Sequence, residues 1–432
     1  MAAIDPVKQI SSHEFESDFV LDLPRALERF AALPPSTVAP YLTVTLDWQP
    51  DGNQPNRRPG RQHFDQEAAA LMEGREAHDP ATESLRADLE QITTFLDGDL
   101  PPSCRGVAVV ACHAAGVFEA VPLGLPLPNS MTQGPTPALA SLARLAEDNA
   151  TYAVLLADQR EATLSLITQG QTERDVELTG TDFPRHQSQG GWSQRRYERR
   201  AEERINAFAR TIAEETQKAM DERGVQTLVL AGDEAITPAL NGAFHQTVQD
   251  RIVGTIPFDI RGNEQELIDA TLPLVEQAER EREAAAVRAA KDGVGAGGAG
   301  AGGPEDVLTA LQTGQVMTLV MADDFSAPGW ADFTFPVYGT GEVPAEHPAG
   351  GDVANIVPVA LEEEMIRLAV QTGAEIEIVK TSVPVGMDEL ADIPDADAAQ
   401  PRSDTALELD EFGGVAAVLR FALDAGQSTA DL

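Results

Sequence analysis

The clearest pattern of apolar and polar positions lies in the middle of the chain, between residues 197 and 219. Arginine or glutamate stands at many of the positions between the apolar ones. The apolar or small side chains recur at intervals of three and four residues: Tyr197, Ala201, Ile205, Phe208, Ile212, Thr216 and Ala219. Because an α-helix turns once in 3.6 residues, this spacing places them along one face. The pattern predicts a long amphipathic helix with one buried side.

Short apolar runs on either side of this helix predict strands. Two runs, 151–157 and 162–168, are separated by a polar turn at 158–161, a spacing typical of a β-hairpin. Further runs at 227–231 and 252–258 predict buried strands, and the charged stretch 263–290 predicts a second long helix. Hairpin, helix, strand and helix in this order are typical of a layered α/β domain.

The flanking segments also mix the two patterns. Before the hairpin, strand-like runs at 41–48 and 105–112 enclose a helical stretch at 66–96. A patch rich in Pro, Gly and Asn, 123–137, leads into a short predicted helix at 137–146.

The last third predicts another α/β segment, with helices at 305–311 and 359–372 and strands at 316–321 and 375–379. We therefore expect the fold class α/β, as three layered α/β domains. Their expected bounds are 1–148 for an N-terminal domain of unclear role, 149–292 for the central domain and 304–432 for an acidic C-terminal domain.

A tract of Gly and Ala, 293–303, contains the spacing G-x-G-x-x-G at Gly295, Gly297 and Gly300. A dinucleotide site needs a strand before this motif and a helix after it. A charged helical stretch precedes the motif here, so we predict a flexible linker.

Composition narrows the class of protein. The chain has 432 residues and a net charge of -39, which argues against broad attraction to nucleic acid, and residues 305–432 carry 24 acidic and four basic side chains. No apolar run reaches the roughly 18 residues of a membrane span. We expect a soluble, cytoplasmic protein without membrane contact.

Other candidate chemistry is sparse. The two cysteines, Cys104 and Cys112, are eight positions apart and predict reduced core residues. The histidines are scattered without metal-ligand spacing, so we expect no metal and no cofactor. Glu362, Glu363 and Glu364 begin a predicted helix, whose N-terminus favours negative charge.

One stretch is basic in this acidic chain. Between residues 185 and 210 there are seven arginines against three glutamates. Two adjacent glycines, Gly190 and Gly191, precede Trp192-Ser193-Gln194, and the long predicted helix follows.

This stretch resembles the central domain of the archaeal and eukaryotic class-one peptide chain release factors, where a basic loop carries Gly-Gly-Gln, Ser, an Arg-aromatic pair and a long helix. The hairpin with Asp158 in its turn, and the strand 225–231 leading into Gly232, are also similar. Three later stretches resemble the family's C-terminal domain: 304–311, 315–320 and 412–421. Roughly two thirds of the chain is covered. The resemblance implies a ribonuclease-H-like central domain and a C-terminal domain like release factor domain 3.

The loop departs from the family's pattern at one position. An ungapped alignment of Ser193, Arg196, Tyr197 and Arg199 puts Trp192 at the position of the catalytic Gln, and Gln194 falls two residues later. Gly-Gly-Trp-Ser-Gln looks more like the loop of a bacterial and archaeal branch of release-factor relatives than like that of the decoding release factors themselves. The N-terminal segment lacks the family's Asn-Ile-Lys-Ser motif, so reading of stop codons is not expected.

The resemblance implies hydrolysis of the peptidyl-tRNA ester on the ribosome. Such a site needs a group that orients water and stabilises an oxyanion, and glycines let a loop approach RNA closely. The implied catalytic residues are Gly190, Gly191 and Gln194. The implied RNA-binding residues are Arg185, His186, Trp192, Arg195, Arg196, Arg199 and Arg200.

Three other interpretations remain open. The protein could be a non-catalytic ribosome-binding rescue or hibernation factor that resembles Pelota. The ribonuclease-H-like architecture also suggests tRNA processing or a nuclease. The loop could be an ordinary surface loop with Ser193 as N-cap of the helix. By resemblance, residues 304–432 would contact a translational GTPase.

Overall fold

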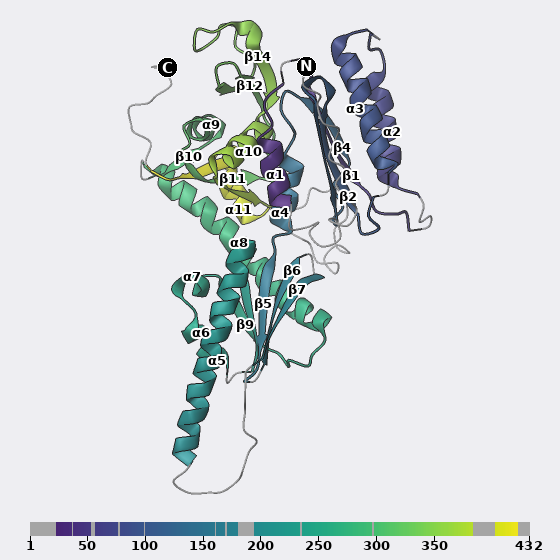
Figure 1. Ribbon diagram of the computed structural model, residues 1–432. Helices are drawn as coiled ribbons and strands as arrows, with labels where there is room; N and C mark the ends of the chain where they lie inside the picture. The colour runs from purple at the N-terminus through teal and green to yellow at the C-terminus, as the bar shows by residue number, and fades with distance from the viewer. Residues whose placement is uncertain are drawn as a thin grey trace, which may run out of the picture. The chain divides into compact units, whose positions relative to one another are not determined.

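The computed structural model describes residues 23–36, 38–52, 57–76, 78–98, 100–159, 161–168, 171–179, 194–233, 236–295, 298–382 and 402–421. Two compact units are formed: Met1–Glu147 together with Glu283–Leu432, and Asp148–Arg282. Both combine sheets and helices (Figure 1), so the α/β fold class is confirmed. The finer division into three domains stays a prediction.

The unit Asp148–Arg282 is built on one sheet, with strand order β7-β6-β5-β8-β9. Its strands are β5 (Tyr152–Ala157), β6 (Glu161–Thr168), β7 (Gln171–Thr179), β8 (Leu228–Gly232) and β9 (Ile252–Pro257). The first three are antiparallel neighbours, whereas β8 pairs parallel with both β5 and β9. This order agrees with the expected ribonuclease-H-like architecture.

Helices cover both faces of this sheet. On one face, α5 (Gln194–Arg223), α6 (Thr237–Ala243) and α7 (Gln246–Gln249) pack against alternate residues of β5 such as Ala153 and Leu155. On the other, α8 (Glu264–Gly295) packs against Tyr152, Val154 and Leu156. The strand is therefore buried on both sides, which explains its uninterrupted apolar sequence.

The amphipathic pattern at 197–219 is confirmed as part of α5. Of the residues in this pattern, Ile212 and Thr216 are buried, and Ile205, Phe208 and Ala219 are partly buried. By contrast, β7 was not predicted, because its sequence QTERDVELT is mostly polar, and its two apolar residues, Val176 and Leu178, are too few to give a clear strand pattern. Pairing with β6 makes it a strand nonetheless.

In the other unit, the N-terminal part forms an antiparallel sheet in the order β3-β2-β1-β4. Its strands are β1 (Tyr41–Asp47), β2 (Gly106–Cys112), β3 (Val117–Leu123) and β4 (Ser130–Gly134), and its helices are α1 (Leu23–Ala31), α2 (Pro59–Met72), α3 (Pro80–Leu96), the 3-10 helix η1 (His113–Ala115) and α4 (Ala140–Asp148).

Two expectations in this part need correction. The helical stretch 66–96 is two helices, because Asp79 accepts the Thr82 N–H and Pro80 starts a new helix. The patch 123–137, in which no strand was predicted, contains β4, which pairs with β1. The two cysteines are free and buried, as predicted.

The C-terminal part of the same unit forms two further sheets. One has the order β10-β16-β11-β15, and a small sheet, here called the mini-sheet, has the order β13-β12-β14. The elements are β10 (Gly300–Gly302), α9 (Pro304–Gln312), β11 (Val316–Ala322), β12 (Pro328–Asp332), β13 (Val337–Thr340), the 3-10 helix η2 (Val353–Asn355), β14 (Ile356–Ala360), α10 (Leu361–Thr372), β15 (Glu375–Val379), α11 (Asp404–Asp410) and β16 (Val415–Leu419).

The Gly and Ala tract takes part in these elements. Residues 293–295 complete α8, and Gly300 begins β10, which pairs with β16. Helix then strand is the reverse of the order around a dinucleotide site. The tract therefore contributes a short edge strand, a role that its composition did not indicate.

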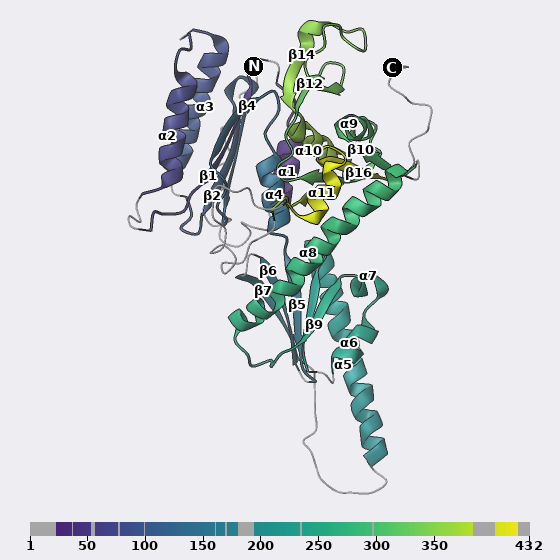
Figure 2. The same cartoon turned by 180° about the vertical axis from the view of Figure 1, so that it is seen from behind.

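One hydrophobic core joins the N-terminal and C-terminal parts of this unit. It combines residues such as Phe30 and Leu142 with Leu308, Leu319 and Met365. Figures 1 and 2 both show α1 and α4 between the N-terminal sheet and α10. The opposite face of that sheet packs on α2 and α3 through a separate cluster.

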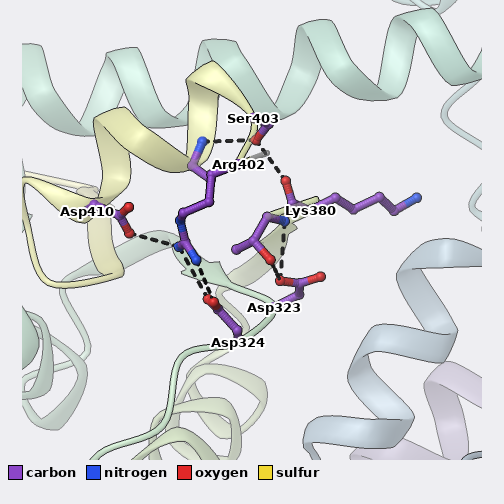
Figure 3. A network of polar contacts seen from close by, with 8 residues as sticks. Asp323, Asp324, Lys380, Arg402, Ser403 and Asp410 are labelled. Atoms are coloured by element: carbon purple, nitrogen blue, oxygen red, sulfur yellow. Dashed lines mark hydrogen bonds and ion pairs between the residues drawn. The ribbon is translucent and has the colours of Figure 1, made fainter. Parts of the chain in front are cut away.

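Polar contacts close one end of the sheet that contains β11 and β15 (Figure 3). Arg402 donates to Asp324 at 2.6 Å and to Asp410 at 2.9 Å, and Asp323 accepts the N–H of Thr381 at 3.2 Å. Because β11 and β15 run parallel, Asp323 and Thr381 follow their carboxyl ends at the same edge. These contacts hold α11 against that edge.

Candidate functional site

The predicted loop lies between β7 and α5. Its residues Arg185, His186, Gly190, Gly191 and Trp192 fall outside the described residues, as does Ser193. The structure does describe both ends: β7 ends at Thr179 and α5 begins at Gln194. The other site candidates occupy positions in the first two turns of α5: Gln194, Arg195, Arg196, Arg199 and Arg200.

The strand end of the loop is held by a tight turn. Thr179 pairs with Glu161, the first residue of β6. Asp158 closes the turn between β5 and β6, because its N–H donates to the Glu161 carbonyl at 2.9 Å and its carboxylate accepts the Glu161 N–H at 2.8 Å. The segment that begins after Thr179 therefore starts from a fixed register.

The end of β8 approaches β5 too closely for any side chain. Gly232 has φ 141°, and a Cβ there would lie 1.9 Å from the Ala157 carbonyl oxygen. Asp233 follows, with its N–H bonded to that same oxygen at 3.1 Å. Glycine is therefore required where the resemblance placed it.

Asp233 links the end of β8 to the turn that holds β7 and to the start of α6. Its carboxylate accepts the Gln159 side-chain N–H at 3.1 Å, beside the turn that holds β7. Its carbonyl accepts the N–H of Ile236 at 3.1 Å, just before α6, which packs on α5. Gln159 and Asp233 could not be linked from the sequence, because only the tertiary pairing of β5 and β8 brings them together.

The helix end of the loop favours anions. The first N–H groups of an α-helix have no partner within the helix, and the peptide dipoles place a partial positive charge there. Gln194 is the first residue of α5, and Arg195, Arg196, Arg199 and Arg200 follow in its first two turns. The free N–H groups and the peptide dipoles at the N-terminus of a helix favour the binding of phosphate groups.

The described residues were also compared with the arrangements of side chains that hold metal ions. Asp158 and Asp233 follow the carboxyl ends of β5 and β8, but no group of three or more His, Cys, Asp or Glu side chains is arranged to hold an ion among these residues. None of the described helices is long and apolar enough to cross a membrane.

Comparison with known proteins matches the same segment. Residues 137–283 match the model of bacterial archaeo-eukaryotic release factor family 10. The α/β fold, together with the loop between β7 and α5, is therefore release-factor-like. The match covers about a third of the chain and agrees with the resemblance that the loop sequence indicated.

Curated relatives support this placement. Peptide chain release factor subunit 1 of Thermococcus onnurineus is 25% identical over 263 residues, which cover 54% of this chain and 62% of the relative. The protein of the same name from Archaeoglobus fulgidus is 24% identical over 299 residues, which cover 64% of this chain and 67% of the relative. The chain thus matches less than two thirds of the length of the first relative.

Two solved structures are also similar. Pelota of Archaeoglobus fulgidus is 15% identical, with a TM-score of 0.28, and the match covers 73% of this chain and 79% of Pelota. Dom34 of S. cerevisiae, described as a translation termination-like factor, is 12% identical, with a TM-score of 0.36 and coverage of 72% and 77%. At such low TM-scores these matches add nothing to the fold described above.

Proposed function

We propose that this protein is a translation release or rescue factor that hydrolyses the peptidyl-tRNA ester on the ribosome through the loop Gly190–Gln194. The observation that carries the proposal is the family match over residues 137–283, which spans the whole loop together with β7 and α5. The names of the curated relatives, peptide chain release factors, support the same reaction. A factor that acts on ribosomes would work in the cytoplasm.

The proposed reaction needs few protein groups. A water oxygen attacks the ester carbonyl carbon, the bond to the tRNA oxygen breaks, and the proton from water passes to the departing tRNA hydroxyl. Gly190 and Gly191 let the backbone approach the ester, and Gln194 orients the water. Since Gln194 is the first residue of α5, its N–H is among those without a helical partner and is available to an oxyanion.

The arginines around the loop bind RNA in this proposal. Arg185, Arg195, Arg196, Arg199 and Arg200 neutralise phosphates without reading sequence. His186 and Trp192 add contacts, with Trp192 stacking on a base. This local positive charge lets a chain with a net charge of -39 enter an RNA-rich site.

The test is release of labelled peptide from ribosomes that hold peptidyl-tRNA. We expect Gln194→Ala to lower the release rate about a hundredfold, because it removes the group that positions water. Gln189→Ala, a change of the same kind immediately before Gly190, is the matched control and should keep most of the activity. Equal rates for wild type and Gln194→Ala would contradict the assignment of Gln194.

A second function is favoured by one observation. Trp192 stands where the family carries its catalytic Gln, which suits a non-catalytic rescue or hibernation factor of the Pelota type. In that case no variant releases peptide, yet the protein sediments with ribosomes. Binding would then be lost in Arg195→Glu/Arg196→Glu and kept in Lys218→Glu/Arg223→Glu, a reversal of two charges near the other end of α5.

The C-terminal part extends the proposal to a partner. Residues 304–432 would contact a translational GTPase, by analogy with the release factor family. Among the similar solved structures, Dom34 is described as interacting with Hbs1, and archaeal Pelota as ribosome-bound together with ABCE1.

A further inference from the structure

The mini-sheet carries exposed apolar side chains on an ordered support. In the segment 333–355, which links β12 to β14 and includes β13, Phe335 is 55% exposed, Val343 41% and Val353 36%. Single exposed apolar residues are common on protein surfaces and need no explanation.

A buried polar pair fixes the segment. His347 Nε2 lies 3.0 Å from Asp332 Oδ2, and the two side chains are 1% and 0% exposed. His347 Nδ1 accepts the N–H of Ala349 at 3.1 Å, so the ring proton is on Nε2 and is donated to Asp332. Asp332 Oδ1 accepts the N–H of Thr334 at 2.7 Å. Of residues 342–350, all but His347 are exposed or partly exposed, so this pair determines their path.

The mini-sheet is also attached to the helices beneath it. Arg367 of α10 lies over the rings of Phe333 and Tyr338, at 5.8 and 5.7 Å from their centroids. The N–H of Tyr338 donates to the Gln312 side chain of α9 at 3.1 Å. The segment is therefore held rigidly to the main body of its unit.

Phe335 and Val353 stand at the same end of the mini-sheet. Asp332 pairs with Val337 in β13 and with Ile356 in β14, so the turn that holds Phe335 and the η2 helix that holds Val353 both lie beyond this end. The Phe335 ring meets His347 edge-on, with centroids 6.3 Å apart. The buried pair thus supports the more exposed of the two side chains directly.

Charge around these residues is of one sign. Residues 333–355 contain no Lys or Arg, whereas Glu342, Glu346 and Asp352 are exposed. A nucleic acid would be repelled, and so would a second copy of this chain, whose net charge is -39. Complementarity favours a protein that brings positive charge.

We propose that Phe335 and Val353 form a docking surface for a protein whose contact face presents an apolar side chain surrounded by Lys and Arg. The acidic residues steer this partner, and Phe335 supplies the buried anchor, since aromatic residues dominate interface energetics. Rigid support lowers the entropy lost on binding, which gives the buried Asp332–His347 pair a role beyond stability. The proposal is independent of the chemistry of the Gly190–Gln194 loop.

Photo-crosslinking of the full chain tests the proposal. The photoreactive residue p-benzoylphenylalanine replaces Phe335 in one protein and, as matched control, Phe421, which is 57% exposed elsewhere in the same unit, in another. Each is irradiated in an extract of the source cells, and products are identified by mass spectrometry. We expect one nuclease-resistant product with a Lys- and Arg-rich protein, formed from position 335 alone.

Charge and anchor are then tested separately. Glu342→Lys/Asp352→Lys should lower the yield of this product about tenfold, whereas Glu73→Lys/Glu76→Lys, a reversal of two exposed charges after α2, should leave it unchanged. With the purified partner, Phe335→Ser/Val353→Ser should weaken binding about tenfold or more, and Phe421→Ser should not.

Four outcomes would overturn the proposal: no product, a product with RNA, the same product from position 421, or a partner that is itself acidic. Sedimentation with ribosomes is measured in parallel. A basic partner without ribosome binding would support the docking surface and count against the proposed function. Ribosome binding without a crosslinked protein would reject the docking surface alone.

Discussion

Asp88 is a carboxyl group that folding places in an unfavourable environment. It lies in α3 with 1% of its surface exposed, and burial raises its pKa to about 6, although it accepts the N–H of His113 at 2.7 Å. Since the folded pKa lies above the ordinary value of 3.8, the folded state is favoured at low pH, and stability is lost as pH rises between about 4 and 6.

We predict that Asp88→Asn stabilises the protein at neutral pH, because the amide oxygen keeps the contact with His113 without the buried charge. A shift of this size corresponds to a gain on the order of 3 kcal/mol at pH 7 and none at pH 4. Denaturant unfolding of both proteins across this pH range measures the difference. Glu90→Gln, an exposed change in the same helix, is the control, and a constant difference for Asp88→Asn at all pH values would refute the account.

At the scale of an element, α10 ties distant parts of its unit together through buried charge. Glu364 and Arg367 form an ion pair with side chains 1% and 3% exposed. Arg367 also donates to the Tyr338 hydroxyl at 2.8 Å, and Glu364 accepts from Thr136. Glu363 accepts the N–H of Ala140 at 2.8 Å, and burial raises its pKa. The favourable helix dipole explains these glutamates only in part, because Glu363 and Glu364 also make specific buried contacts.

We expect Arg367→Met alone to cost about 3–5 kcal/mol of unfolding free energy, because it leaves the Glu364 charge buried without its partner. The double change Arg367→Met/Glu364→Gln should cost clearly less than the sum of the two single changes. Chemical denaturation of the four proteins gives the coupling energy. Strict additivity would mean that the pair contributes nothing through its mutual interaction.

How much of each element could be predicted depended on whether its signal was local. The helix α5 followed from its spacing of three and four, and Ile212 and Thr216 of that pattern are buried. The polar strand β7 did not, because its stability comes from pairing with β6. The candidate site residues came from the motif Gly190–Gln194 and stay a prediction, whereas the contact between Gln159 and Asp233 became visible only through the pairing of β5 with β8.

At the scale of the whole molecule, sequence patterns could not indicate which segments share a core. Gln371 donates to the carbonyl of Ala31 at 2.6 Å, and Ile378 donates its N–H to Glu147 at 2.6 Å. Phe30, from the first helix, is fully buried in the same cluster as Met365. Contacts between residues so far apart leave no periodic signal, so this shared core could not be predicted from the sequence.

The shared core makes a prediction about fragments. Residues 148–282 supply both faces of their own sheet, so this fragment should fold alone and unfold cooperatively. Residues 1–147 contribute α1, α4 and one face of β2 to a core completed by residues after 283, so alone they should expose apolar surface, bind a hydrophobic dye and aggregate. Co-expression with residues 283–432 should restore a soluble complex, because the buried faces are then covered. Cooperative unfolding of residues 1–147 by themselves, at the midpoint of the full chain, would instead support three independent domains.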